Sequence, residues 1–207
     1  MRSHFRWIAA IAPALLLILT ATPAMASIGN IKSALLRPGD APSGFSHPHV
    51  AMYTRFSEKM EVRTLAAGSQ TMRSCEVPRS FARQGWREGF IQAFDSTRSQ
   101  TTLQMCVSLF KTARGAHAAY VYRTERQLKL LIKLGEMKQL ATTQIGDESM
   151  TVGGGDLCKC GGMTAARTYE IVFRRDNALV DLAYQGASSF TQVGFERLAV
   201  RINSNLH

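Results

Sequence analysis

One helical segment, residues 112–136, lies between segments that alternate like β-strands, and this order constrains the fold most. In TARGAHAAYVYRTERQLKLLIKLGE the apolar residues recur at helical spacing. Before it, WREGFIQAFDS and TTLQMCVSLFK flank the polar turn TRSQ and indicate a β-hairpin. Apolar side chains from Leu103 to Leu109 share one face of the second strand, while Cys106 and Phe110 fall on the other. That strand is therefore expected to be central and covered on both faces.

The remaining segments complete an α+β pattern. Two short strands are expected around the turn at Gly146, and the alternation in RTYEIVFRRDNALVDLAYQG predicts a second hairpin. A C-terminal amphipathic helix is predicted over 189–206, capped by Ser189 or Thr191. We expect a largely antiparallel sheet of about six strands, with the long helix and the C-terminal helix packed on it. Residues 38–78 match neither period and are expected to be partly irregular.

The N-terminus indicates export. Two arginines precede an apolar run from Trp7 to Leu19, and Ala24-Met25-Ala26 forms an Ala-x-Ala cleavage pattern, so residues 1–26 are predicted to be a signal peptide. The apolar run is shorter than the roughly 20 residues that span a bilayer, and no transmembrane anchor is expected after cleavage. We expect a secreted or periplasmic protein with a single α+β domain over 27–207.

Four cysteines in an exported chain predict disulfides. Cys75, Cys106, Cys158 and Cys160 can pair in three ways. A ring closed across one residue is strained, so Cys158 and Cys160 are expected to pair with Cys75 and Cys106 rather than with each other. Each disulfide would contribute about 2 to 4 kcal/mol of stability by restricting the unfolded chain.

The Cys158/Cys160 pair also supports an alternative function. A thiol pair beside Lys159 could exchange disulfides as a periplasmic or extracellular redox protein. Thiolate and thioether ligands also suit Cu(I), and Met163 follows the pair, while His47, His49 and Met52 stand together elsewhere. The zinc spacing of paired cysteines is absent. We expect neither a metal nor another cofactor, and keep the thiol-redox or Cu(I)-binding function as the alternative.

Basic residues recur along the predicted long helix. Arg123, Arg126, Lys129 and Lys133 follow one another at steps of three, three and four, which predicts a cationic stripe on one helix face. A solvated face of an amphipathic helix explains the same pattern. The net charge is +10 for the whole chain and +8 after removal of the signal segment, which favours anionic partners. An anionic envelope component or a small ligand is the candidate partner, whereas export and the lack of a binding motif argue against nucleic acid.

Signatures of catalysis are missing from the sequence. No Gly-x-Ser-x-Gly turn is present, and the three glycines at 153–155 are not followed by Gly-Lys-Ser/Thr. Asp147 and Glu148 are adjacent, which fits a turn better than a pair of catalytic acids. We therefore expect that the protein is not an enzyme.

Four stretches carry a resemblance to known proteins: LLRPGDAPSGF, VSLFKTARGAHAAY, IGDES and IVFRRDNALVDL. With them the chain resembles a group of uncharacterised secreted bacterial proteins. Its order of strands and helices is loosely similar to the extracellular sensor domains of bacterial serine/threonine kinases and to small secreted lipoproteins. The resemblance implies an exported, non-catalytic binding or sensor-like domain, stabilised by disulfides. A pocket is hypothesised between the sheet and residues 46–77, because long unpatterned stretches often form binding loops.

Overall fold

The computed structural model describes most of the chain after the predicted signal segment. The described residues are 29–98, 101–155, 166–187 and 190–206. The predicted signal segment, Cys158, Cys160 and Met163 lie outside them. Within the described residues, no helix is long and apolar enough to cross a membrane.

Nine strands and several helices make up the described part of the chain. The strands are β1 (Phe45–Tyr53), β2 (Lys59–Ala66), β3 (Ser69–Glu76), β4 (Trp86–Ser96), β5 (Thr102–Phe110), β6 (Lys138–Gln139), β7 (Glu148–Gly155), β8 (Ala166–Arg175) and β9 (Ala178–Ala187). The helices are η1 (Ile31–Ala34), η2 (Pro38–Asp40), α1 (Arg79–Arg83), α2 (Ala113–Val121), η3 (Tyr122–Leu128), α3 (Lys129–Lys133) and α4 (Gln192–Asn205).

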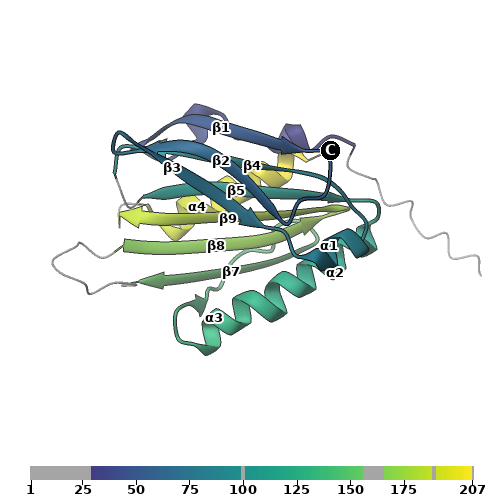
Figure 1. Ribbon diagram of the computed structural model, residues 1–207. Coiled ribbons are helices and arrows are strands. Elements are labelled where there is room, and N and C mark those ends of the chain that lie inside the picture. The colour runs from purple at the N-terminus through teal and green to yellow at the C-terminus, as the bar shows by residue number, and fades with distance from the viewer. Residues whose placement is uncertain (1–28, 99–100, 156–165, 188–189, 207) are drawn as a thin grey trace, which may run out of the picture.

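The strands form one sheet in the order β3-β2-β4-β5-β9-β8-β7-β6, and β1 pairs with the free edge of β4. Every pairing is antiparallel except that of β2 with β4, which consists of Ala66 beside Ser96. Because β2 joins the sheet only at that end, the β2–β3 hairpin is free to turn across the sheet instead of extending it. Figure 1 shows this hairpin in front of β4 and β5.

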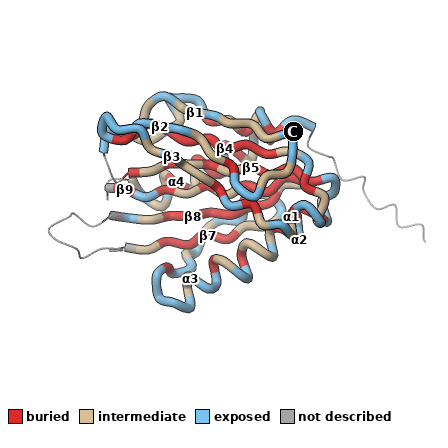
Figure 2. Tube along the Cα trace, in the orientation of Figure 1, coloured by how far each residue is buried: buried red, intermediate tan, exposed pale blue. Residues whose placement is uncertain are grey.

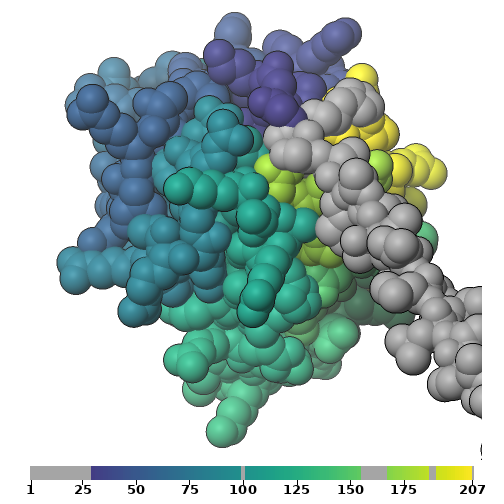
Figure 3. Space-filling model, turned by 90° about the vertical axis from the view of Figure 1, so that its right-hand side faces the viewer, coloured from purple at the N-terminus to yellow at the C-terminus, as the bar shows by residue number. Residues whose placement is uncertain are grey.

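The sheet is covered on both faces. Helices α2, η3 and α3 run continuously across the front of the sheet in Figure 1, and α4 lies behind it. Seen from the side, the blue N-terminal strands and the yellow C-terminal helix lie on opposite sides of the molecule (Figure 3). Thr191 caps α4, as predicted, by accepting a hydrogen bond from the Gly194 backbone N–H at 3.2 Å.

Alternation along the central strands produces two cores, visible as red segments across the middle of the molecule in Figure 2. On the side of α4 and η1 the core contains Leu103, Met105, Val107, Ile171, Phe173, Val180, Leu182 and Phe195. On the side of the long helix and the hairpin it contains Met60, Cys75, Phe81, Ile91, Phe110, Ala119, Leu128, Val172 and Leu179. The predicted central position of the strand that carries Cys106 is confirmed, since β5 lies between β4 and β9.

The predicted α+β class is confirmed, but the expected sheet of about six strands was too small. Residues 38–78, expected to be partly irregular, hold β1, β2 and β3. Their apolar pattern is weak because few of their residues are buried. None of the nine residues of β1 is fully buried, and one of the eight residues of β3 is. A bulge at His47, with φ 42°, further breaks the alternation of β1 before Pro48.

Candidate functional site

A cavity of about 250 Å³ lies between the β2–β3 hairpin, the long helix and the sheet. This is the place hypothesised from the sequence, although its outer wall is a regular hairpin. Its lining residues come from seven helices and strands, namely β2, β3 with the residue after it, α1, β5, η3, β8 and β9. They are Met60, Ser74, Cys75, Glu76, Val77, Phe81, Gln104, Cys106, Ser108, Arg123, Gln127, Glu170, Leu179, Asp181 and Ala183. The cavity therefore depends on contacts between segments that are distant in sequence.

A disulfide between Cys75 of β3 and Cys106 of β5 holds the hairpin over the sheet. Both edges of β5 are occupied by β4 and β9, so this bond must cross a face of the sheet. Gln104 supports the same wall by donating a hydrogen bond to the Ser74 carbonyl at 3.3 Å. The expected pairing of Cys75 and Cys106 with Cys158 and Cys160 was wrong. The positions of the cysteines in the sequence could not reveal that the β2–β3 hairpin folds back over β5.

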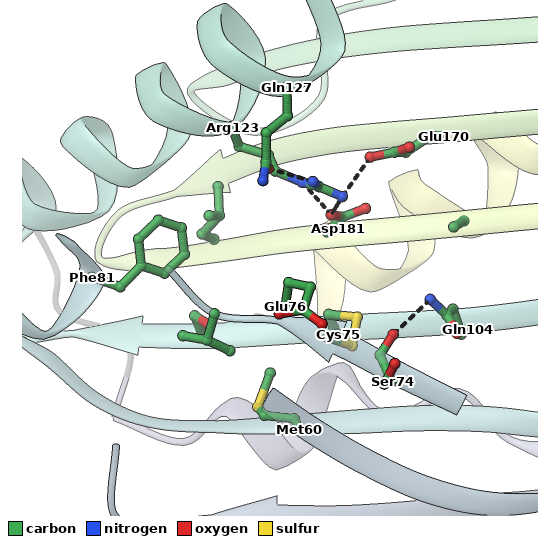
Figure 4. A pocket seen from close by; sticks show the side chains of 15 residues that line it. Met60, Ser74, Cys75, Glu76, Phe81, Gln104, Arg123, Gln127, Glu170 and Asp181 are labelled. Atoms are coloured by element: carbon green, nitrogen blue, oxygen red, sulfur yellow. Dashed lines mark hydrogen bonds and ion pairs between the residues drawn. A yellow bond between two sulfur atoms is a disulfide. The ribbon is translucent and has the colours of Figure 1, made fainter. Parts of the chain in front are cut away.

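Three charged side chains meet at one side of the cavity (Figure 4). The Arg123 guanidinium donates from Nε to Asp181 Oδ2 at 2.7 Å and from Nη2 to Glu170 Oε1 at 2.8 Å. Its Nη1 donates to the side chain of Gln127. The acids stand on neighbouring strands and on the same face, with Glu170 on β8 and Asp181 on β9. The cluster thus contains two carboxylates for one guanidinium.

Burial shifts the protonation of this cluster. Glu170 is 8% exposed, and burial followed by the charge of Asp181 raises the pKa of Glu170 to about 8, against the lowering effect of Arg123. Burial lowers the pKa of Arg123, but Asp181 and Glu170 more than offset this and raise it overall. At neutral pH Glu170 therefore holds a proton while Arg123 is charged.

Arg123 and Gln127 stand in η3, a π-helical segment within the long helix. Such segments are rare and occur frequently at functional sites. Of the four basic residues predicted to form one stripe, the structure places Arg123 toward the cavity, with 27% of its side chain exposed. Arg126, Lys129 and Lys133 are exposed, and Lys129 forms an ion pair with Glu125 at 2.6 Å. Binding of an anionic partner by these residues stays a prediction.

Apolar side chains form the other side of the cavity. Met60, Val77, Phe81 and Leu179 are all at least 95% buried. Phe81 comes from α1, a five-residue helix too short to give a recognisable periodicity. Its ring packs edge-on against Phe110 with centroids 5.5 Å apart. The cavity therefore combines an apolar end with a charged end.

The other candidate residues are dispersed. His49 Nε2 lies 2.8 Å from Asp95 Oδ1, and His47 contacts Ser46. Among the described residues, no group of three or more His, Cys, Asp or Glu side chains is placed to hold a metal ion. The thiol-redox and Cu(I) hypotheses depend on residues outside the described ones and stay predictions.

Asp147 and Glu148 have a structural partner, Arg174 of β8. The Arg174 guanidinium contacts Asp147 at 2.9 Å and Glu148 at 2.6 Å, and Glu148 also contacts His117 at 2.8 Å. These contacts tie the turn before β7 to the end of β8 and to α2. The two acids thus stabilise the turn, which is the role that their adjacency in the sequence predicted.

Comparison with known proteins identifies the fold. No protein-family model matches the sequence, and no curated protein matches it. Among solved structures, the extracellular domain of PknH from Mycobacterium tuberculosis is similar, with a TM-score of 0.56 and 14% sequence identity. The similarity covers 88% of this chain and 97% of that one. The resemblance to extracellular sensor domains of bacterial serine/threonine kinases is therefore confirmed at the level of the fold.

Proposed function

We propose that the protein is an exported, non-catalytic binding domain whose ligand occupies the cavity beneath the β2–β3 hairpin. The observation that carries this proposal is the convergence of buried charges on that cavity. Burying ionised groups costs several kcal/mol each unless they are paired. A cluster of two acids and one arginine at a cavity wall is costly to maintain for folding alone, and it supplies the few placed polar groups that a ligand site needs.

Export is supported by three independent features. The first 26 residues have the pattern of a secretory signal peptide. The Cys75–Cys106 disulfide fits an oxidising compartment. The similar solved structure is itself an extracellular domain, which fits a protein that works outside the cytoplasm.

A non-catalytic role is supported by the state of the cavity's reactive groups. Both cysteines in its wall are joined in a disulfide, and Arg123 is engaged by Glu170, Asp181 and Gln127. Among the residues that the structure describes, no histidine lines the cavity to act as a base for Ser74 or Ser108. The arrangement favours recognition over chemistry.

A cavity-filling variant tests the proposal. Ala183 lines the cavity from β9, so Ala183→Phe should occupy the space while leaving the sheet pairing intact. A library of small polar fragments is screened by amide NMR shifts on the wild type. Fragments should shift amides of β3, η3 and β9, and these shifts should disappear in Ala183→Phe.

Val200→Phe is the matched control, because Val200 is 51% exposed on α4, on the opposite side of the sheet. It should bind the same fragments as the wild type. Fragments that bind equally well to Ala183→Phe, or a library that shifts no cavity amide, would show that this cavity is not the binding site.

A further inference from the structure

We propose that the cavity binds a small organic cation, an aliphatic amine or guanidine, between the carboxylates of Glu170 and Asp181. This inference rests on the proposed function, because it names the ligand chemistry of the same cavity.

The lining carries more acids than bases. Glu170 and Asp181 face the cavity (Figure 4), and Glu76, an exposed residue at the end of β3, also lines it. Arg123 is the one basic residue among the described residues of the lining. The cavity is therefore an anionic pocket in a strongly basic protein, whose net charge is +10. The long-range attraction of the whole molecule favours anions, so selectivity for a cation must come from the pocket itself.

Arg123 is not available to an anionic ligand. Its Nε, Nη1 and Nη2 donate to Asp181, Gln127 and Glu170 respectively. An incoming phosphate or carboxylate would have to displace one of these acceptors and would then lie beside two carboxylates. Two negative charges in direct contact repel each other strongly in a buried site, so binding of an anion there is unfavourable.

The carboxylates retain acceptor capacity. Arg123 contacts Asp181 through Oδ2 and Glu170 through Oε1, and the protonated Glu170 also hydrogen-bonds to Asp181. When that proton leaves, the acceptor positions that it held become open to a ligand. An ionised carboxylate has about four acceptor positions in all. An ammonium or guanidinium supplies only N–H donors, so it satisfies these positions and neutralises the second negative charge.

Shape and size select the rest of the ligand. The apolar end, formed by Met60, Val77, Phe81 and Leu179, suits an aliphatic chain and not a polar one. The volume of about 250 Å³ lies below the roughly 300 to 1,000 Å³ of sites for drug-sized ligands. A short alkyl chain with one cationic head fits both features.

A proton occupies the place of the cation when the cavity is empty. The charged groups that act on Glu170 are Asp181 on β9 and Arg123 on η3, while Glu76 on β3 also lines the cavity but is exposed. Burial and Asp181 raise the pKa of Glu170 to about 8. A bound cation would replace that proton, so binding should tighten as the pH rises toward 8.

Three probes of equal chain length test the head group: n-butylammonium, butyrate and 1-butanol. Each is titrated into the exported protein with its disulfide intact, and amide shifts of the cavity strands are followed at pH 8. n-Butylammonium should bind saturably, at least tenfold more tightly than butyrate or 1-butanol. Its Kd should rise about tenfold between pH 7 and pH 6, as a one-proton exchange requires.

Glu170→Gln and Asp181→Asn should each raise the Kd for n-butylammonium at least tenfold. Each keeps the side-chain size, and both are checked for folding by their amide spectra. Glu125→Gln is the matched control, because Glu125 is a carboxylate on η3 that is 51% exposed and pairs with Lys129 outside the cavity. Its Kd should stay within twofold of that of the wild type.

The outcomes separate the two proposals. Butyrate or 1-butanol binding in the cavity as tightly as n-butylammonium would overturn the cation inference and leave the cavity as a binding site. An unchanged Kd in both Glu170→Gln and Asp181→Asn would do the same. If the fragment screen identifies cavity ligands but n-butylammonium shifts no cavity amide, the cation inference is wrong; if neither does, both proposals are wrong.

Discussion

Gln92 hydrogen-bonds twice to the backbone of Leu36. Its Oε1 accepts from the Leu36 N–H at 2.9 Å, and its Nε2 donates to the Leu36 carbonyl at 2.8 Å. Both residues are at least 98% buried. The amide of Gln92 thus takes the place of a neighbouring strand and fastens the N-terminal segment to β4.

Gln92→Leu should lower the free energy of unfolding by about 2 to 5 kcal/mol. The variant keeps the side-chain volume but leaves two buried backbone groups of Leu36 without partners, at roughly 1 to 3 kcal/mol each. Urea denaturation followed by tryptophan fluorescence measures the loss. Gln70→Leu, at an exposed position of β3, is the control and should stay near the wild type. A loss below 1 kcal/mol in Gln92→Leu would contradict this role.

Removal of the disulfide should destabilise the fold and weaken ligand binding together. The bond closes a chain segment with a sequence separation of 31, for which restriction of the unfolded chain predicts a loss of about 3 to 4 kcal/mol. The double variant Cys75→Ala, Cys106→Ala is compared with the wild type by thermal unfolding and by fragment binding. Equal stability, or unchanged binding at a temperature where the variant is folded, would show that the bond does not support the cavity wall.

The free energy of unfolding should depend on pH because Glu170 titrates differently in the folded and unfolded states. Its pKa is about 8 in the folded state and roughly 4.3 in an unfolded chain. The folded state therefore holds a proton that the unfolded chain has released, so this stabilisation is complete below about pH 4.3 and is lost as the pH rises toward 8.

The Glu170→Gln variant has no titrating group at this position, so its free energy of unfolding should lack this pH-dependent contribution. Between pH 5 and pH 8, the difference in free energy of unfolding between the wild type and Glu170→Gln should change by up to about 1.4 kcal/mol per pH unit. Urea denaturation at each pH gives the difference. Glu125→Gln should follow the wild-type curve in parallel, and a parallel curve for Glu170→Gln would refute the assignment.

Gly115→Ala should destabilise helix α2 despite the higher helix propensity of alanine. A Cβ at this position would lie 2.1 Å from the carbonyl oxygen of Gln84, so backbone must move. We expect a loss of about 2 kcal/mol or more, beyond the roughly 1 kcal/mol that alanine gains over glycine in a helix. Gly39→Ala, where a Cβ meets no atom within 4 Å, is the control for thermal unfolding. Equal melting temperatures of the two variants would show that the close approach can relax without cost.

Local patterns predicted the parts of this fold whose partners are close in sequence. The hairpins β4–β5 and β8–β9 carry apolar alternation on both faces and are joined by short turns, which is why their pairing could be read from the sequence. Hairpin β2–β3 lacked such a signal because half of the residues of β3 are exposed and one, Cys75, is buried. Its position over β5 depends on the Cys75–Cys106 bond, and connectivity among four cysteines does not follow from spacing.

The charged cluster illustrates the same limit. Arg123 looked like one member of a solvated stripe, because its acidic partners are 47 and 58 residues away. One signal was available: Glu170 and Asp181 interrupt otherwise apolar strands at positions that share a face with Val172 and Leu179. A charge in a strand expected to be covered on both faces requires a buried partner, and an arginine on the covering helix is the nearest candidate.

The walls of the cavity come from segments that are distant in sequence, and we expect them to meet late in folding. The hairpin wall, the π-helical segment and strands β8 and β9 are separated by dozens of residues, so the pocket has no counterpart in any fragment of the chain. Contacts over such distances form slowly, after local hairpins and helices. A ligand bound there would stabilise only completed molecules, by RT ln(1 + [L]/Kd), and would thereby mark correctly oxidised and fully folded copies.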